Sequence, residues 1–190
     1  SPHPSALNCI TETVNVVRRA AESAGAPAGC VSCISTPTLE ATNALMKHDD
    51  TRLILATGGG AMVKAAYSSG TPAIGVGAGN GPAYIHRTAN VQMAVKRILD
   101  SKTFDNGTIC ASEQSIVVEK AMERAVTEEL KRQGAYLLSD AEHKTLSRFI
   151  LRANGTMNPQ IVGKSVETVA KLAGLSGIPA SARVLVARET

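Results

Sequence analysis

Apolar residues follow two alternating patterns along the chain, one typical of helices and one typical of buried strands. Near the N-terminus Ile10, Val14, Val17 and Ala21 recur at offsets of four, three and four, which places them on one face of a helix. Further along, short aliphatic runs such as 53–57 and 72–76 are bounded by glycine, proline or polar residues, as buried strands are. Because such strands alternate with helices of about ten residues, the pattern predicts βαβ units and a parallel sheet.

The order of the elements predicts an α/β protein with two domains. Residues 1–78 are expected to form part of a doubly wound domain, with helices at 6–22, 37–46 and 61–67 and strands at 30–34, 53–57 and 72–76. Residues 79–190 are expected to form a second α/β unit, with strands at 83–86, 115–119 and 183–188 and helices at 90–101, 121–132, 141–151 and 166–175. The character of the chain changes after a glycine-rich segment, so the boundary is placed near Ala78.

The composition supports this class and argues against several others. Hydrophobic residues make up 44% of the chain and aromatic residues only 3%, so the core is expected to be aliphatic, as in α/β proteins. The net charge of +4 is spread along the chain and few aromatic rings are available for stacking, which argues against nucleic-acid binding. No apolar run reaches the roughly 18 residues of a membrane span, and the first residues do not resemble a signal peptide, so we expect a cytoplasmic protein.

Two groups of glycines mark candidate binding segments. Gly58–Gly60 directly follows a predicted strand and opens a predicted helix, where backbone N–H groups are able to contact a phosphate; a simple tight turn is the alternative. Gly75, Gly77, Gly79 and Gly81 alternate along an extended segment and leave one side of it without side chains. A ligand or another backbone segment would fit there, and so would a crossing between domains that merely needs room.

Four cysteines are too few for a secreted disulfide framework. Cys30 and Cys33, three positions apart, fall on opposite faces of the predicted strand, so both are expected to pack in the core, as is Cys9 on the first helix. The four histidines are widely separated, and no metal site is expected. Cys110 differs because it lies in a polar loop at 103–112, and the residues alone leave open a catalytic nucleophile and a buried inert thiol.

Three phrases of the sequence together resemble the aldehyde dehydrogenase superfamily. They are TGGGAMVKAAYSSG from Thr57, GVGAGN from Gly75 and SKTFDNGTICASEQ from Ser101. Their sequences are similar to those of the CoA-acylating branch, which includes the aldehyde dehydrogenase half of bifunctional aldehyde-alcohol dehydrogenases. The resemblance implies an aldehyde dehydrogenase-like fold, with the C-terminal portion of a Rossmann-type NAD-binding domain at 1–78 and part of a catalytic-cysteine domain at 79–190.

The resemblance implies a reversible, NAD-dependent oxidation of a short aldehyde to an acyl-CoA. The Cys110 thiolate would attack the aldehyde, the thiohemiacetal would pass a hydride to NAD, and coenzyme A would take the acyl group from the Cys110 thioester. The backbone N–H of Cys110 would help to hold the oxyanion. Hydrolytic members carry a water-activating glutamate six residues before the proline that matches Pro82; Val76 stands there in this chain, which favours the acylating branch.

The same resemblance assigns cofactor binding to the glycine turn. The residues that match the turn around the pyrophosphate are Thr57, Gly58, Gly59 and Gly60, and Gly77 is assigned to the cofactor as well. Hydrolytic members often carry a lysine near the ribose at the position of Ser1–Pro4. That lysine is absent here, so a preference for NAD over NADP stays open.

Members of the superfamily are more than twice as long as this chain, which is therefore expected to be a central segment of a longer enzyme and nearly inactive by itself. The full-length enzyme is expected to be a homo-oligomer in the cytoplasm or in a bacterial microcompartment. The identity of the aldehyde stays open. Two other functions also stay open: a non-catalytic nucleotide-binding or assembly module, and a hydrolytic aldehyde dehydrogenase.

Overall fold

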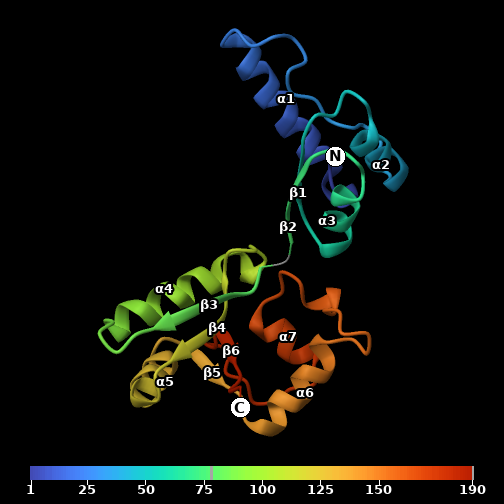
Figure 1. Cartoon of the computed structure of the whole chain (residues 1–190). Helices are drawn as coiled ribbons and strands as arrows, with labels where there is room; N and C mark the ends of the chain where they lie inside the picture. The colour runs from blue at the N-terminus through green and yellow to red at the C-terminus, as the bar shows by residue number, and fades with distance from the viewer. Residues whose placement is uncertain (78, 190) are drawn as a thin grey trace. The chain divides into compact units, whose positions relative to one another are not determined.

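The chain divides into two compact units, Ser1–Ala78 and Gly79–Thr190 (Figure 1). The computed structural model describes residues 1–77 and 79–189. Ala78, near which the sequence places a domain boundary, lies outside the described residues.

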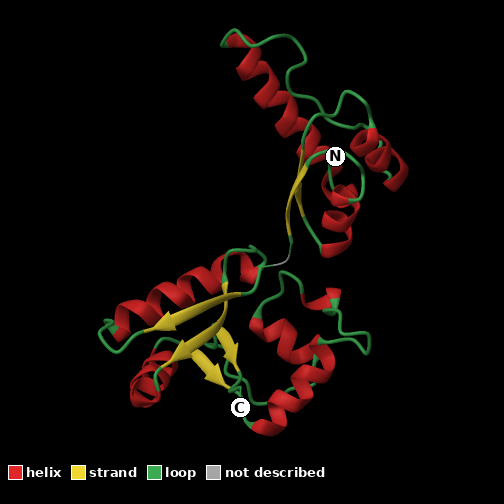
Figure 2. Ribbon diagram, viewed as in Figure 1, coloured by secondary structure: helices red, strands yellow, loops and turns green. Residues whose placement is uncertain are grey.

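The first unit contains a parallel pair of strands that ends in the glycine turn. Its elements are η1 (Pro4–Ala6), α1 (Leu7–Ser23), α2 (Leu39–Lys47), β1 (Ile54–Thr57), α3 (Gly60–Tyr67) and β2 (Ala73–Val76). β1 and β2 run side by side (Figure 2), with Ile54 opposite Ala73 and Thr57 opposite Val76. A small buried cluster holds the strands and helices together; it consists of Met46, Ile54, Ala56 and Ala66.

Helix α3 packs closely on β2. A methyl group on Gly75 would lie 2.5 Å from Cγ1 of Val63 and 2.9 Å from the ring of Tyr67, so only glycine leaves room for the helix. The Tyr67 hydroxyl also accepts a hydrogen bond of 3.0 Å from the Gly75 N–H. This contact fixes the helix that begins at the glycine turn against the strand that ends beside it.

The second unit carries two further parallel strand pairs. Its elements are β3 (Gly81–Ile85), α4 (Val91–Thr103), η2 (Phe104–Gly107), β4 (Glu113–Val118), η3 (Lys120–Met122), α5 (Glu123–Arg132), β5 (Ala135–Leu137), α6 (Asp140–Ile150), η4 (Pro159–Ile161), α7 (Val166–Leu172) and β6 (Val184–Val186). β3 pairs with β4 and β5 pairs with β6, both in parallel (Figure 2).

The core of the second unit is aliphatic and centres on α4. Val95 and Leu99 on this helix are 0% and 2% exposed and belong to one cluster with residues of β3, α5 and β5. The Asn90 side chain caps α4 by accepting a hydrogen bond of 3.0 Å from the Met93 N–H. The burial of α4 matters for the site because its last turn leads directly into the loop with Cys110.

The predicted α/β class with parallel strand pairs is confirmed, and most helices lie within a few residues of their predicted bounds. The predicted strand at 30–34 is wrong: no described strand pairs with this segment, and a strand is stable only when a neighbour takes its hydrogen bonds. The turn that precedes it is closed by a bond of 3.2 Å from the Cys30 N–H to the Pro27 carbonyl. α7 ends at Leu172, three residues before the predicted end.

The short strand β5 was not predicted, because three residues are too few to show a period.

Within the described residues, no helix is both long and apolar enough to cross a membrane.

Candidate functional site

Cys110 is exposed on a loop whose backbone turns through an unusual conformation. Asp105, Asn106 and Gly107 all have positive φ angles, of 51°, 50° and 71°. This left-handed region suits glycine and is tolerated by asparagine and aspartate. Thr108 closes the turn, since its N–H and its hydroxyl donate bonds of 3.1 Å and 2.8 Å to the Asp105 carbonyl.

The start of this loop is anchored to a distant part of the second unit. The Asn106 amide donates a hydrogen bond of 3.1 Å to the carbonyl of Gly163, which lies between η4 and α7. Gly163 itself lies close to Thr108, because a methyl group on it would be 3.4 Å from the Thr108 hydroxyl. The loop is therefore held from outside as well as by its own turn.

Backbone also packs directly on Cys110. A methyl group on Gly79 would lie 2.0 Å from the Cys110 carbonyl oxygen, so no other residue fits at position 79 without displacing the loop. The sequence left open whether a ligand or another backbone lies against the alternating glycines. At Gly79 it is another backbone segment, whereas at Gly75 it is the side chains of α3.

The end of the loop is buried and hydrogen-bonded. Ser112 is 0% exposed, and its N–H donates a bond of 3.2 Å to the Ile109 carbonyl. Lys102 and Gln114 lie on the two sides of the loop and bond to each other at 2.8 Å. The sequence pattern does not single out Lys102, Asn106 or Gln114, because hydrogen bonds between positions far apart in the chain leave no periodic signal.

The glycine turn of the first unit has an open surface. Thr57 ends β1, and the Gly58 N–H donates a bond of 3.1 Å to the carbonyl of Val76. Gly59 is the N-cap of α3, and no side chain caps the helix. Among the described residues, and apart from chain neighbours and the backbone of α3 itself, no atom lies within 4 Å of the position that a Cβ on Gly59, Gly60 or Gly77 would occupy.

An open helix N-terminus of this kind suits a phosphate group. Its first N–H groups have no carbonyl partner within the helix, and the helix dipole places partial positive charge there. The parallel register puts Val76 opposite Thr57, so Val76 lies at the same end of the strand pair as the turn. Ligands of open parallel sheets bind at this carboxyl end.

The other three cysteines are not fully buried in a core. Cys9 and Cys30 are exposed and Cys33 is half-buried, so the expected core packing is wrong for Cys9 and Cys30. The reason at Cys30 is the absence of the predicted strand, which leaves the residue in a surface turn. In the part of the chain that the structure describes, no group of three or more His, Cys, Asp or Glu side chains could hold a metal ion.

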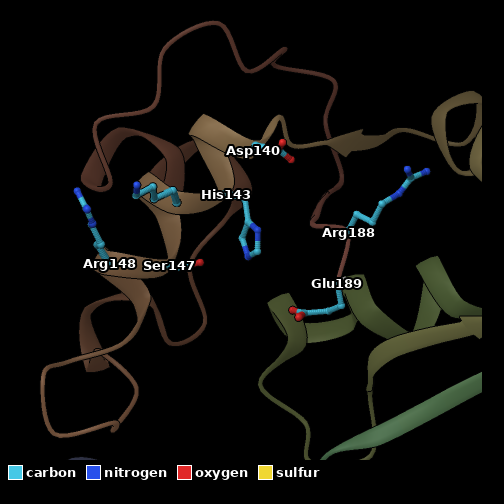
Figure 3. Close-up of a pocket in the computed structure, with 7 residues that line it drawn as sticks. Asp140, His143, Ser147, Arg148, Arg188 and Glu189 are labelled. Carbon is cyan, nitrogen blue, oxygen red and sulfur yellow. The ribbon is translucent and has the colours of Figure 1, made fainter.

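A surface pocket of about 500 Å³ lies elsewhere on the second unit, between α6 and the segment after β6 (Figure 3). His143 on α6 lines it together with Arg188 and Glu189 after β6; the Glu189 side chain points toward the α6 side, whereas the Arg188 side chain extends away from it. None of the site residues predicted from the sequence lines this pocket. The exposed Cys110 loop and the glycine turn remain the candidates for chemistry.

Comparison with known proteins gives one family match over most of the chain. The family model described as "Aldehyde dehydrogenase family" matches residues 3–173. The bifunctional aldehyde-alcohol dehydrogenase of Escherichia coli is 50% identical over 190 residues, which cover 100% of this chain and 21% of that protein. The chain thus spans about a fifth of the length of this curated relative.

Solved structures agree with this match. An acetylating aldehyde dehydrogenase from Geobacillus thermoglucosidasius superimposes with a TM-score of 0.92 and 53% identity, covering 100% of this chain and 41% of that one. A propionaldehyde dehydrogenase from Rhodopseudomonas palustris, solved with bound CoA and an acylated cysteine, gives a TM-score of 0.87 and 34% identity, covering 98% and 43%.

Proposed function

Because the chain belongs to the aldehyde dehydrogenase family, we propose that it carries the nucleophile and part of the cofactor site of a CoA-acylating aldehyde dehydrogenase. The predicted family and fold are confirmed by the matches over 3–173 and over the whole chain. The whole protein would convert a short aldehyde, NAD and coenzyme A into an acyl-CoA and NADH, and would also run in reverse. The acetylating relative and the CoA-bound relative support this branch of the family.

Cys110 is the residue that we assign to covalent chemistry, and its exposure on an anchored loop is the observation that carries the proposal. Its thiolate would add to the carbonyl carbon of the aldehyde, and after oxidation the acyl group would remain on the sulfur as a thioester. The thiol of coenzyme A would then attack this thioester and release Cys110. Such a loop holds the sulfur and the Cys110 N–H in one arrangement, which favours stabilisation of the oxyanion.

The glycine turn of the first unit fits a dinucleotide phosphate. The open positions beside Gly59 and Gly60 and the uncapped start of α3 let backbone N–H groups approach an anion. We assign the cofactor turn to Thr57, Gly58, Gly59 and Gly60, in which the Gly58 N–H is bonded to Val76 and the open positions are Gly59 and Gly60, with Gly77 on the open segment after β2. NAD, when bound, would supply the hydride acceptor.

Val76 supports acyl transfer to a thiol over hydrolysis. It stands where hydrolytic relatives are expected to carry a glutamate, and an aliphatic side chain cannot deprotonate water. The thioester on Cys110 would therefore persist until coenzyme A arrives. Formation of a homo-oligomer and the location in the cell stay predictions from the sequence.

The test measures acetyl transfer from acetyl-CoA to Cys110, and aldehyde oxidation, in the full-length protein. With acetyl-CoA, the acetyl group should move to the Cys110 sulfur and free coenzyme A should appear, as mass mapping of the cysteine peptides would show. Acetaldehyde, NAD and coenzyme A should give NADH, and Cys110→Ser should lower kcat by at least about 1,000-fold. Cys9 and Cys30, which are exposed in the other unit, serve as internal reference thiols.

Three outcomes would contradict the proposal. Coenzyme A-dependent turnover that survives Cys110→Ser would remove Cys110 from the chemistry. NADH formation that needs no thiol acceptor would indicate a hydrolytic enzyme. NAD binding in a calorimeter without acetyl transfer to Cys110 would indicate a non-catalytic nucleotide-binding module.

A further inference from the structure

Lys102 is connected to the end of the loop that carries Cys110. It lies in the last turn of α4, and its Nζ donates a hydrogen bond of 2.8 Å to the side-chain oxygen of Gln114, near the start of β4. The Gln114 amide nitrogen in turn lies 3.4 Å from both the carbonyl oxygen and the hydroxyl of Ser112. Ser112 is fully buried, so a series of side-chain bonds runs from α4 to the fixed end of the loop.

Lys102 also lies against the beginning of the same loop. A methyl group on Gly107 would be 3.4 Å from Cε, Nζ and the carbonyl oxygen of Lys102. Gly107 is the last of the three residues in the left-handed region. One lysine side chain therefore lies beside the segment before Cys110 and bonds to the segment after it.

The ammonium group of Lys102 has an electrostatic role as well. Oε2 of Glu113 is buried and has no hydrogen-bond partner among the residues described. A buried carboxylate needs a nearby positive charge, and Lys102 supplies one. Burial lowers the pKa of Lys102, and the negative charge of Glu113 acts in the opposite direction and favours the ammonium form.

We propose that Lys102 is a positioning residue for Cys110: by lying beside Gly107 and bonding to Gln114 it holds the Cys110 loop, and with it the thiol and the backbone N–H, in the arrangement that acyl transfer requires. It acts through Gly107, Gln114 and Ser112. The inference rests on the proposed function, in which Cys110 is the nucleophile. A loop released at one end populates fewer reactive arrangements, and small displacements of reacting groups are costly in rate.

The experiment compares two reactions of Cys110 in the full-length protein. Acetyl transfer from acetyl-CoA needs an oriented oxyanion donor, whereas alkylation by iodoacetamide is a simple displacement of iodide by sulfur. We expect Lys102→Met to lower the limiting rate of acetyl transfer by about tenfold at an unchanged half-saturating concentration of acetyl-CoA. Alkylation of Cys110, measured relative to Cys30, should change by less than about threefold. Lys102→Arg keeps the cation and should restore most of the rate.

Lys96→Met is the matched control. Lys96 lies on the same helix, is exposed and pairs with Asp100, so its loss should leave acetyl transfer unchanged. Gln114→Met offers an independent test, because it breaks the bond to Lys102 from its exposed end. This variant should show the same loss of acetyl transfer even where Lys102→Met does not fold.

The inference would be overturned by acetyl transfer at the wild-type rate in either Lys102→Met or Gln114→Met. An equal loss in Lys96→Met would overturn it too, since the effect would then be one of charge or general stability. An absence of acetyl transfer to Cys110 in the wild-type protein would remove the proposed function and this inference with it.

Discussion

The α-carbon of Gly79 lies directly against the carbonyl oxygen of Cys110. A methyl group built on Gly79 would be 2.0 Å from this oxygen and 3.0 Å from the carbonyl carbon. Both partners are backbone groups, so neither is able to rotate away as a flexible side chain would. The segment that leads into β3 thus supports the candidate nucleophile from one side.

Gly79→Ala should therefore disturb the loop. We expect a loss of about 1–3 kcal/mol in the free energy of unfolding, because the Cys110 carbonyl must move to admit the methyl group. Acetyl transfer to Cys110 should slow as well. Urea unfolding measures the first effect, and mass mapping of the Cys110 peptide measures the second.

Gly81→Ala is the control for this prediction. Its methyl group would lie 3.9 Å from the Ser112 carbonyl oxygen, which is an ordinary contact. The free energy of unfolding should change by less than about 0.5 kcal/mol. Equal losses in the two variants would show that the contact with Cys110 has no special weight.

Asn106 should contribute in two separable ways. Asn106→Gly removes the bond to the Gly163 carbonyl but keeps a residue that tolerates a φ of 50°, and should cost about 0.5–1.5 kcal/mol. Asn106→Ala loses the bond and also strains the left-handed backbone, which should cost about 1 kcal/mol more. Denaturant unfolding of the three proteins should rank them wild type, glycine, alanine; an alanine variant as stable as the glycine variant would contradict the assigned strain.

Truncation of Leu99 should strongly destabilise the second unit, because this side chain is 2% exposed within the buried cluster around α4. Leu99→Ala should lower the free energy of unfolding by about 2–5 kcal/mol through the cavity that it leaves. Leu151 is 53% exposed, and Leu151→Ala should cost less than about 0.5 kcal/mol. Thermal or urea denaturation would test the difference between the two.

Glu119 should make stability depend on acid pH. Arg87 bonds to its carboxylate, with an N–O distance of 2.7 Å, and this contact lowers the pKa of Glu119 below its ordinary value near 4.5. Because the folded pKa is the lower one, the charged form contributes stability above the ordinary pKa. This contribution is lost as the pH falls through the folded pKa.

Glu119→Gln should accordingly flatten the fall in melting temperature between about pH 5 and pH 3. Arg87→Met should flatten it too, since Arg87 is the main cause of the lowered pKa. The double variant should behave like either single one. A wild-type pH profile in Glu119→Gln would exclude this ion pair as a source of acid sensitivity.

Most helices could be predicted from the sequence because their signals are local. The expected helix at 6–22 is observed at Leu7–Ser23, and the glycine that follows it has a φ of 95°. The strand expected at 30–34 failed because an aliphatic run does not show whether a partner strand lies beside it. The three-residue β5 could not be predicted, because it is too short to show a pattern of its own. It is a strand because it pairs with β6, which lies far along the chain.

The candidate site divides in the same way. The sequence by itself determined the α/β class, the strand-to-helix glycine turn and the polar loop with Cys110, because these depend on neighbouring residues; the resemblance added the roles, which stay predictions. Only the tertiary structure decided that Gly79 supports Cys110, that Asn106 reaches Gly163 and that Lys102 bonds to Gln114. Such contacts join positions far apart in the chain, and packing, not periodicity, determines which of them form.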